Sequence, residues 1–282
     1  MDVGVGLPST IPGVTTEQVL DAARRAEAAG FHSLGVLDRI VYDNLEPLVT
    51  LAAVAAVTER IRLTTAILIV PNRANVALVA KQAATVDVLS GGRLTLGVGL
   101  GGRNDDYGVS GVPTEGRGKR FEEMLEEMQG YWRGDEVGPK PVQEGGPPLW
   151  VGGMVDAAYR RAARFGAGWI MGGGTPDQLA EGAEKARQAF RDAGREDEPR
   201  IGALMYFALG EDAEATAHRD LTHYYAWLGE EVAEMIASSA ATDEETVKTY
   251  LQAFEAAGCD EAICFPTSPD PEQVDLLAQV AL

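Results

Sequence analysis

The stretch LTLGVGLGGRNDD at 94–106 carries the residues whose spacing most directly suggests chemistry. Gly97, Gly99 and Gly102 form a G-x-G-x-x-G pattern after an apolar run, which matches the glycine fingerprint of dinucleotide-binding folds. That fingerprint requires a helix directly after the loop and an acidic residue about 20 positions further on, at the tip of the next strand. Here a polar, turn-rich segment follows at 103–118, and the residues at the required distance have the pattern of a charged helix. We therefore interpret the glycines as the end of a strand in a different α/β fold.

Other apolar runs also end in residues that present polar groups or exposed backbone. These ends are Asp38 and Arg39, Pro71 to Arg73, Gly99 to Asp106, Gly152 and Gly153, and Gly172 to Gly174. Glycine leaves backbone N–H groups uncovered and allows a ligand to approach closely, which suits a phosphate group or a planar ring. Each glycine pair taken singly indicates an ordinary tight turn. Three glycine-rich ends in consecutive units favour a ligand-binding rim.

The elements that must position these residues alternate between strand and helix along the chain. Strands are predicted at 3–8, 33–38, 62–70, 93–101, 148–153, 168–173, 200–210 and 261–268. Helices are predicted at 15–30, 45–59, 75–91, 120–132 and 156–166, from 175 onward, across a long tract at about 211–258, and from 270 onward. Thr15 with Gln18 has the pattern of a capping box, and Thr175 is the predicted cap of the helix after the sixth strand.

The strands are continuous apolar runs, which is typical of a parallel sheet covered by helices. Eight strand-to-helix units in a chain of 282 residues predict a (β/α)8 TIM barrel, a single domain over 1–282. The helical tract at about 211–258 is then an insertion between strand seven and strand eight. In such a barrel the site is formed by the loops at the C-terminal ends of the strands.

Composition limits the classes of partner. The net charge of −19 disfavours nucleic acid and anionic membrane surfaces, because both repel an acidic protein. No apolar run reaches the roughly 18 to 20 residues of a membrane span, and the first residues lack the pattern of a signal peptide. We therefore expect a cytoplasmic protein that acts on a small molecule.

Several other kinds of site have little support. The three histidines include no pair at helical i, i+4 spacing and no Cys-x-x-Cys motif occurs, so no metal site is expected. A G-x-S-x-G nucleophile elbow is also absent, which disfavours a hydrolase. Cys259 and Cys264 are predicted to be buried, reduced thiols. Four aromatic residues are expected to pack between the helices and the barrel: Tyr131, Trp132, Trp150 and Trp169.

Three longer segments resemble one known family. They are NVALVAKQAATVDVLSGGRLTLGVGLGGRNDDYGVSGV at 75–112, GRGKRFEEMLEEMQGYWRG at 116–134 and PPLWVGGMVDAAYRRAARFGAGWIMG at 147–172. In this order they are similar to the bacterial luciferase-like monooxygenase superfamily, the flavin- and deazaflavin-dependent barrel oxidoreductases. The similarity covers essentially 1–174 and weakens to general topology beyond it.

The resemblance implies a flavin-type cofactor that lies across the C-terminal mouth of the barrel. Backbone amides of Gly152, Gly153 and Met154 would bind its phosphate. The segment beside the ring and ribityl chain comprises Gly99, Leu100, Gly101, Gly102, Arg103 and Asn104. Family members often have a bulged end to strand three, sometimes with a non-proline cis peptide, and Ile67 and Leu68 occupy that position here. Because the cis form costs about 3 kcal/mol, we expect a plain buried strand there.

Two residues at the end of strand two are the candidate catalytic residues. By the resemblance, Asp38 and Arg39 face the reactive side of the ring, where many members have an acidic residue followed by histidine. Arginine at the second position departs from that pattern and argues against histidine-type acid–base catalysis. Arg39 is predicted either to bind an anionic substrate or to stabilise developing negative charge. The alternative is a structural ion pair of these two residues or of near neighbours.

Two cofactors and three classes of function stay open. The Ala-, Gly- and acid-rich composition resembles actinobacterial members that use coenzyme F420, so hydride transfer with F420 is favoured. The alternative is an FMN-dependent monooxygenase that uses O2. A non-catalytic flavin-binding protein and a barrel lyase or isomerase for a phosphorylated metabolite are further alternatives, although no lysine lies at a predicted strand end.

The resemblance also implies a homodimer. Tyr224, Tyr225 and Trp227 in the inserted tract are expected to pack on the barrel wall, with a lid over the mouth or a dimer contact as alternatives.

Overall fold

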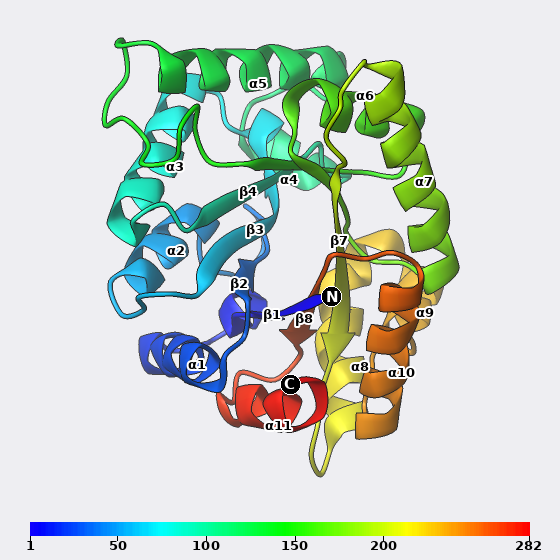
Figure 1. Cartoon of the computed structure of the whole chain (residues 1–282). Coiled ribbons are helices and arrows are strands. Elements are labelled where there is room, and N and C mark those ends of the chain that lie inside the picture. The colour runs from blue at the N-terminus through cyan, green and yellow to red at the C-terminus, as the bar shows by residue number, and fades with distance from the viewer.

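In the computed structural model, which describes residues 1–282, eight parallel strands close into a barrel that helices surround (Figure 1). The strands are β1 (Asp2–Gly6), β2 (Ser33–Val36), β3 (Arg62–Ile69), β4 (Leu94–Gly99), β5 (Leu149–Gly152), β6 (Gly168–Met171), β7 (Arg200–Phe207) and β8 (Glu261–Pro266). Their order around the barrel follows the chain, and β8 pairs with β1 in parallel, with Asp2 opposite Glu261. The predicted (β/α)8 barrel is confirmed.

Helices follow the strands as predicted. They are α1 (Thr16–Ala29), α2 (Pro47–Ala55), α3 (Val76–Ser90), α4 (Asn104–Val109), α5 (Arg117–Arg133), α6 (Asp156–Phe165), α7 (Pro176–Asp192), α8 (Ala213–Tyr225), α9 (Glu230–Ala237), α10 (Glu244–Ala256) and α11 (Glu272–Ala281). Short 3-10 turns occur at η1 (Pro8–Thr10), η2 (Val70–Asn72) and η3 (Ala226–Leu228). The capping boxes of Thr15 and Thr175 are both present. The inserted tract consists of α8, η3, α9 and α10.

One helix, α4, was not predicted. Its sequence NDDYGV lies in the segment 103–118 that local composition assigns to turns, and it contains a glycine. Long-range contacts form it: Tyr107 is 1% exposed and donates from its hydroxyl to Leu100 O at 2.6 Å. Asp106 accepts hydrogen bonds from the main chain after β2. Tertiary contacts therefore override the weak local propensity.

The core has two layers. A cluster of 57 buried residues fills the space between the strands and the surrounding helices and includes Trp132 and Trp169, with Tyr131 packed against it, as predicted. A smaller cluster with Ile170, Leu204, Ile263 and Phe265 contains Trp150. The prediction for Trp150 was wrong, because its ring packs against Gly202 across the strands: a Cβ added at Gly202 would lie 2.9 Å from that ring.

Cys259 and Cys264 are buried and unpaired, as predicted, and burial raises the pKa of each thiol to about 12.

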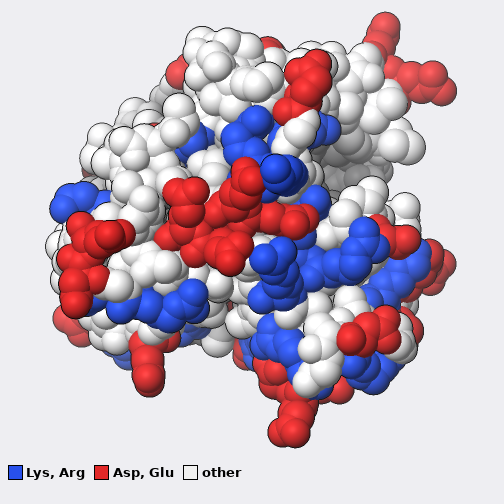
Figure 2. Space-filling view, turned by 90° about the horizontal axis from the view of Figure 1, so that it is seen from above, with Lys and Arg blue, Asp and Glu red and all other residues white.

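None of the helices combines the length and the apolar character that a membrane crossing requires. Figure 2 shows that Lys and Arg side chains lie among Asp and Glu side chains on one face of the molecule.

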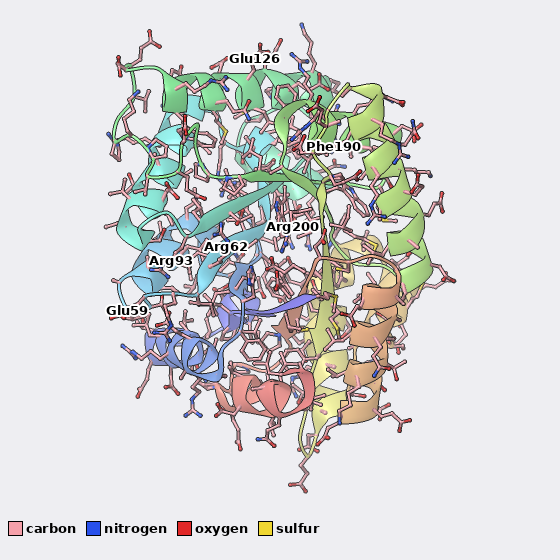
Figure 3. The ribbon with its side chains drawn as sticks, in the orientation of Figure 1. Glu59, Arg62, Arg93, Glu126, Phe190 and Arg200 are labelled. Carbon is pink, nitrogen blue, oxygen red and sulfur yellow. The ribbon has the colours of Figure 1, made fainter.

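Arg93, at the start of β4, holds the base of the barrel together (Figure 3). Its guanidinium donates hydrogen bonds to the main-chain oxygens of Ala55, Thr58, Ile61 and Ser90 at 2.6–3.3 Å. These acceptors lie at the C-terminal ends of α2 and α3 and at the start of β3, where helical carbonyls lack intrahelical partners. One side chain therefore joins three successive elements.

We expect Arg93→Met to lower the free energy of unfolding by about 2–3 kcal/mol, because several carbonyl groups lose a charged donor at once. Urea unfolding followed by circular dichroism measures the loss. Arg60→Met is the matched control, since the Arg60 side chain is 72% exposed and lies 4.0 Å from Glu27. Equal stability of the two variants would contradict this role of Arg93.

Candidate functional site

The residues predicted to form the site meet at the C-terminal mouth of the barrel. A cavity of about 40 Å³ lies there between the ends of β2, β3 and β4. Its lining includes the predicted Asp38, Gly101, Gly102 and Arg103, together with Asn72 and Asp106. The barrel topology brings these segments together because the carboxyl ends of parallel strands share one rim.

Asp38 is a fixed carboxylate at this rim. Its side chain is 1% exposed and accepts hydrogen bonds from the Ile69 N–H at 2.7 Å and from Arg73 Nη1 at 2.7 Å. Arg73 also contacts Glu46 at 3.1 Å. Burial alone would lower the pKa of the Arg73 guanidinium, but the neighbouring Asp38 and Glu46 carboxylates outweigh it and raise that pKa above its usual value. Asp38 therefore ties the end of β2 to the end of β3.

Arg39 is paired with the loop and helix after β4. Its Nε lies 2.9 Å from Asp106 Oδ2, and its Nη2 lies 3.0 Å from Asp105 Oδ2. The Arg39 and Asp106 side chains are 5% and 2% exposed. The other Asp106 oxygen accepts from the N–H groups of Ile40 and Val41. Asp38 and Arg39 thus have separate ionic partners, and the loops after β2 and β4 are joined by charge and by hydrogen bonds.

The end of β3 is not the plain strand that the energetic argument favoured. The Ala66–Ile67 peptide is cis, and the register against β4 shifts between Thr65 and Leu68. That expectation was wrong, because it considered the single peptide alone and not the bulged pairing of β3 with β4 at this point. Leu68 is fully buried in the core between strands and helices. The structure therefore brings Ile67 to the rim and leaves Leu68 away from it.

Ile67 explains several rim glycines. A Cβ added at Gly152 would lie 2.1 Å from Ile67 Cδ1, and one at Gly99 would lie 3.1 Å from Ile67 Cγ2. The same side chain lies 3.6 Å from the Cβ position of Gly172. These glycines leave room for one isoleucine, which forms an apolar platform at the centre of the mouth.

The remaining predicted residues of the loop after β4 have different surroundings. Leu100 packs against the core, and Gly101 and Arg103 line the cavity. Asn104 begins α4 and is exposed. A Cβ added at Gly102 would lie 3.3 Å from the Trp227 ring.

The loop after β5 leads into a helix whose N-terminus has no side-chain cap. Gly153 has φ +128°, and Met154 is 44% exposed. Val155 precedes α6 and provides no side-chain cap, so the first amides of this ten-residue helix have no capping side chain. Helix N-termini of this kind bind phosphate through backbone N–H groups. The first turn of α6 contains Asp156, so any attraction for an anion there would come from the backbone alone.

An aromatic segment from the insertion covers the mouth. The Arg103 Cζ lies 4.6 Å from the ring centroids of both Tyr224 and Trp227. Tyr225 Oη lies 2.8 Å from Tyr206 Oη on β7. The expected packing on the barrel wall was therefore wrong, since these rings contact rim residues and match the lid alternative.

This closure limits what the mouth can hold. Sites for drug-sized ligands are about 300–1,000 Å³, whereas the cavity is about 40 Å³. The cavity between the ends of β2, β3 and β4 is therefore too small for a three-ring group and has room only for a small polar group. The loop after β5 lies outside this restriction, because Gly153 and Met154 are exposed.

Asn72 and Asp220, two polar residues near the mouth, were not among the predicted catalytic or cofactor-binding residues. Asn72 is 4% exposed, and its Oδ1 is buried without a hydrogen-bond partner. Burial raises the pKa of Asp220, on α8, from 3.8 to about 7. Burial and then the Asp220 charge raise the pKa of Tyr42 to about 12. The position of Asn72 directly after a strand could have identified it from the sequence. Nothing in the local sequence pattern distinguishes Asp220 from a helical residue that faces solvent.

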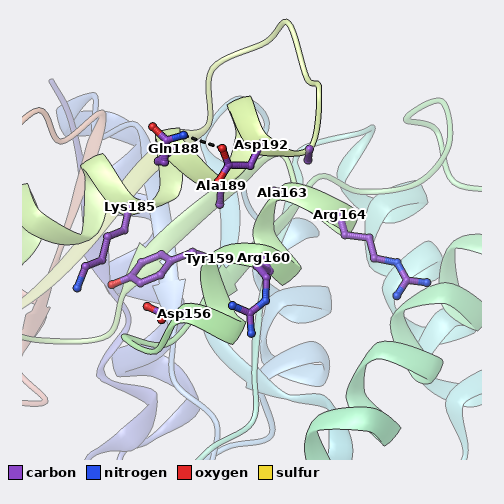
Figure 4. Close-up of a pocket in the computed structure, with 10 residues that line it drawn as sticks. Asp156, Tyr159, Arg160, Ala163, Arg164, Lys185, Gln188, Ala189 and Asp192 are labelled. Atoms are coloured by element: carbon purple, nitrogen blue, oxygen red, sulfur yellow. Dashed lines mark hydrogen bonds between the residues drawn. The ribbon is translucent and has the colours of Figure 1, made fainter.

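A larger groove lies outside the barrel, between α6 and α7 (Figure 4). Its volume is about 450 Å³, and its lining includes Tyr159, Arg160 and Lys185. It contains none of the predicted site residues. The candidate site is therefore identified by the polar residues that meet at the mouth of the barrel, and not by the volume of the cavity.

The chain resembles known proteins in sequence and in fold. It matches the family model described as luciferase-like monooxygenase over residues 1–261. It is 30% identical over 236 residues to the F420-dependent glucose-6-phosphate dehydrogenase of Nocardia farcinica, across 71% of this chain and 69% of the relative.

Two solved structures share the fold over nearly the whole chain. An F420-dependent secondary alcohol dehydrogenase in complex with an F420-acetone adduct has a TM-score of 0.80 at 20% identity, covering 99% of this chain and 97% of the other. The oxygenating constituent of 3,6-diketocamphane monooxygenase from Pseudomonas putida, in complex with FMN, has a TM-score of 0.74 at 17% identity, covering 99% and 97%.

Proposed function

The chain belongs to the luciferase-like monooxygenase family, a family of enzymes, and on that premise we propose that it is an oxidoreductase that transfers a hydride with coenzyme F420. Two of the proteins it resembles are named as F420-dependent dehydrogenases. The observation that carries the proposal is the rim: an uncapped helix N-terminus after β5 lies next to an apolar platform, Ile67, set among glycines. An anionic tail and a flat ring require this combination.

The residues fit the cofactor in two parts. Amides of Gly152, Gly153 and Met154 would bind its phosphate, and Ile67 would support its ring. When bound, F420 supplies a two-electron carrier that accepts or donates hydride. Tyr224 and Trp227 would exclude water after closing over the ring.

We further propose that Asp38 and Arg39 are positioning residues. Each already has an ionic partner, Arg73 for Asp38 and Asp106 for Arg39. In these ion pairs both side chains hold fixed charges, and so they would orient the ends of β2, β3 and β4 around the ring. Transfer of a proton by Asp38 would first require the loss of its contact with Arg73.

The second candidate is an FMN-dependent monooxygenase that uses O2. The likeness to the FMN complex of the Pseudomonas putida enzyme favours it. The phosphate subsite is common to both cofactors, so the backbone after β5 does not separate them. A lyase or isomerase has less support, since no lysine lines the cavity and its two carboxylates, Asp38 and Asp106, are held in ion pairs with arginines.

Parallel titrations with F420 and FMN test the proposal. We expect F420 to bind saturably and to change tryptophan fluorescence, because Trp227 lies against Arg103 and Gly102 at the mouth. Trp227→Phe should abolish most of that change while binding, followed by the fluorescence polarisation of F420 itself, persists. Saturation with FMN alone would establish the second candidate, and binding of neither cofactor would refute both.

A further inference from the structure

We propose that Arg103 and Asn72 form a subsite at the barrel mouth for a carboxylate group of the substrate. The inference depends on the proposed function only in taking the anion to be part of the substrate. It follows from the missing carboxylate partner of Arg103, from the geometry of its guanidinium, and from the unpaired amide of Asn72.

Three arginines surround the mouth, and one of them lacks a carboxylate partner. Arg39 is paired with Asp105 and Asp106, and Arg73 with Asp38 and Glu46. No carboxylate oxygen lies within 4.0 Å of the Arg103 guanidinium.

The two carboxylates that line the same cavity are already satisfied. Asp38 accepts from the Ile69 N–H and from Arg73. Asp106 accepts from two main-chain N–H groups and from Arg39. Arg103 is therefore the one charged side chain of the cavity lining that has no oppositely charged partner, while the four carboxylates and three guanidiniums at the mouth together carry one net negative charge.

The surroundings of Arg103 leave its donors free. Ring centroids of Tyr224 and Trp227 lie 4.6 Å from its Cζ, and Tyr225 lies at 5.9 Å. Rings in this arrangement stabilise a cation without using its N–H groups. Its one hydrogen bond runs from Nη1 to Tyr224 O at 3.3 Å. Guanidinium has five N–H donors in a planar fork, so a pair of donors remains for a carboxylate.

Asn72 faces the same cavity with an unused amide. It is 4% exposed, and its Oδ1 is buried with no partner, an arrangement that costs about 1–3 kcal/mol when nothing compensates. Rotation of the amide exchanges Oδ1 and Nδ2, so Asn72 can present a donor to an anion. A bound carboxylate would then satisfy Arg103 and Asn72 together.

The size of the cavity suits the group. One water requires about 10–15 Å³, and the cavity is about 40 Å³. This volume accommodates a planar group of three heavy atoms. Charge-assisted hydrogen bonds from a guanidinium to a carboxylate are the strong, two-point kind.

The test uses the protein without cofactor and three probes: acetate, acetamide and inorganic phosphate at constant ionic strength. Acetate and acetamide have nearly the same shape and differ in charge. We expect acetate to change the fluorescence of Trp227 saturably and to raise the melting temperature, and acetamide to do neither. Equal responses to acetate and acetamide would overturn the proposal. Tighter binding of phosphate than of acetate would overturn the carboxylate assignment.

Variants separate this subsite from general charge effects. Arg103→Gln should weaken acetate binding at least tenfold, and Asn72→Leu should weaken it several-fold. Arg160→Gln is the control, because Arg160 is an exposed arginine without a carboxylate partner that lies in the outer groove. Circular dichroism verifies that each variant is folded. Acetate affinity that is unchanged in a folded Arg103→Gln protein would refute the assignment, whatever the F420 titration shows.

Discussion

Arg39→Met is expected to lower the free energy of unfolding by about 3–5 kcal/mol, because it leaves a buried carboxylate without its counter-charge. The carboxylate is that of Asp106, whose side chain is 2% exposed and lies 2.9 Å from Arg39 Nε. Asp105 would add a second negative charge close to it. Urea unfolding measures the loss.

A double-mutant cycle separates the ion pair from other effects of Arg39. Asp106→Asn keeps an acceptor for the N–H groups of Ile40 and Val41 and removes the charge. The double variant should therefore recover much of the stability that Arg39→Met loses. A loss below about 1 kcal/mol in the single variant would contradict the structural role. If folding then stayed intact while turnover was lost, Arg39 would be a catalytic residue.

Asp220→Asn is expected to remove a pH dependence of stability. Burial raises the pKa of Asp220 from 3.8 to about 7, so the folded protein binds this proton more tightly than the unfolded chain does. The stabilisation is complete below the unfolded value of 3.8 and is lost as the pH rises through about 7. The wild-type protein should therefore lose stability across this window, by up to roughly 4 kcal/mol for a shift of this size. Partial solvent access makes the measured difference smaller.

The measurement compares urea unfolding of Asp220→Asn and wild type at about pH 4 and about pH 8. The variant should be the more stable protein at the higher pH and should show a flatter profile. Asp43→Asn, at an exposed aspartate near the same mouth, is the control. Parallel profiles for wild type and Asp220→Asn would contradict the prediction.

The barrel could be predicted because its signals are local and repeated. Thr15 with Gln18 and Thr175 with Gln178 begin helices through contacts three residues apart. Each strand is an apolar run, since both faces of a parallel barrel strand are buried. Eight repetitions of this pattern leave few alternative folds, which is why the topology was predictable.

The details of the site depend on contacts that local patterns do not contain. Arg39 and Asp106 are 67 residues apart in sequence, and Arg103 and Tyr224 are 121 apart. The rim residues were found because strand ends converge in a barrel, whereas their partners are set by side-chain packing. Trp150 was misplaced for the same reason. Both faces of a barrel strand are buried, so the apolar pattern does not show whether a side chain points into the barrel or toward the helices. The cis peptide before Ile67 has no sequence signal of its own.

Ile67 on β3 packs against Gly99 on β4 and Gly152 on β5, so these three positions share one limited space. Because a Cβ at Gly152 would lie 2.1 Å from Ile67 Cδ1, a larger residue at 152 requires the residue at 67 either to change rotamer or to be smaller. Side-chain sizes at positions 67, 99 and 152 should consequently covary inversely among homologues of this chain. Exchanges that enlarge one position should persist over evolutionary time only with a compensating reduction at another.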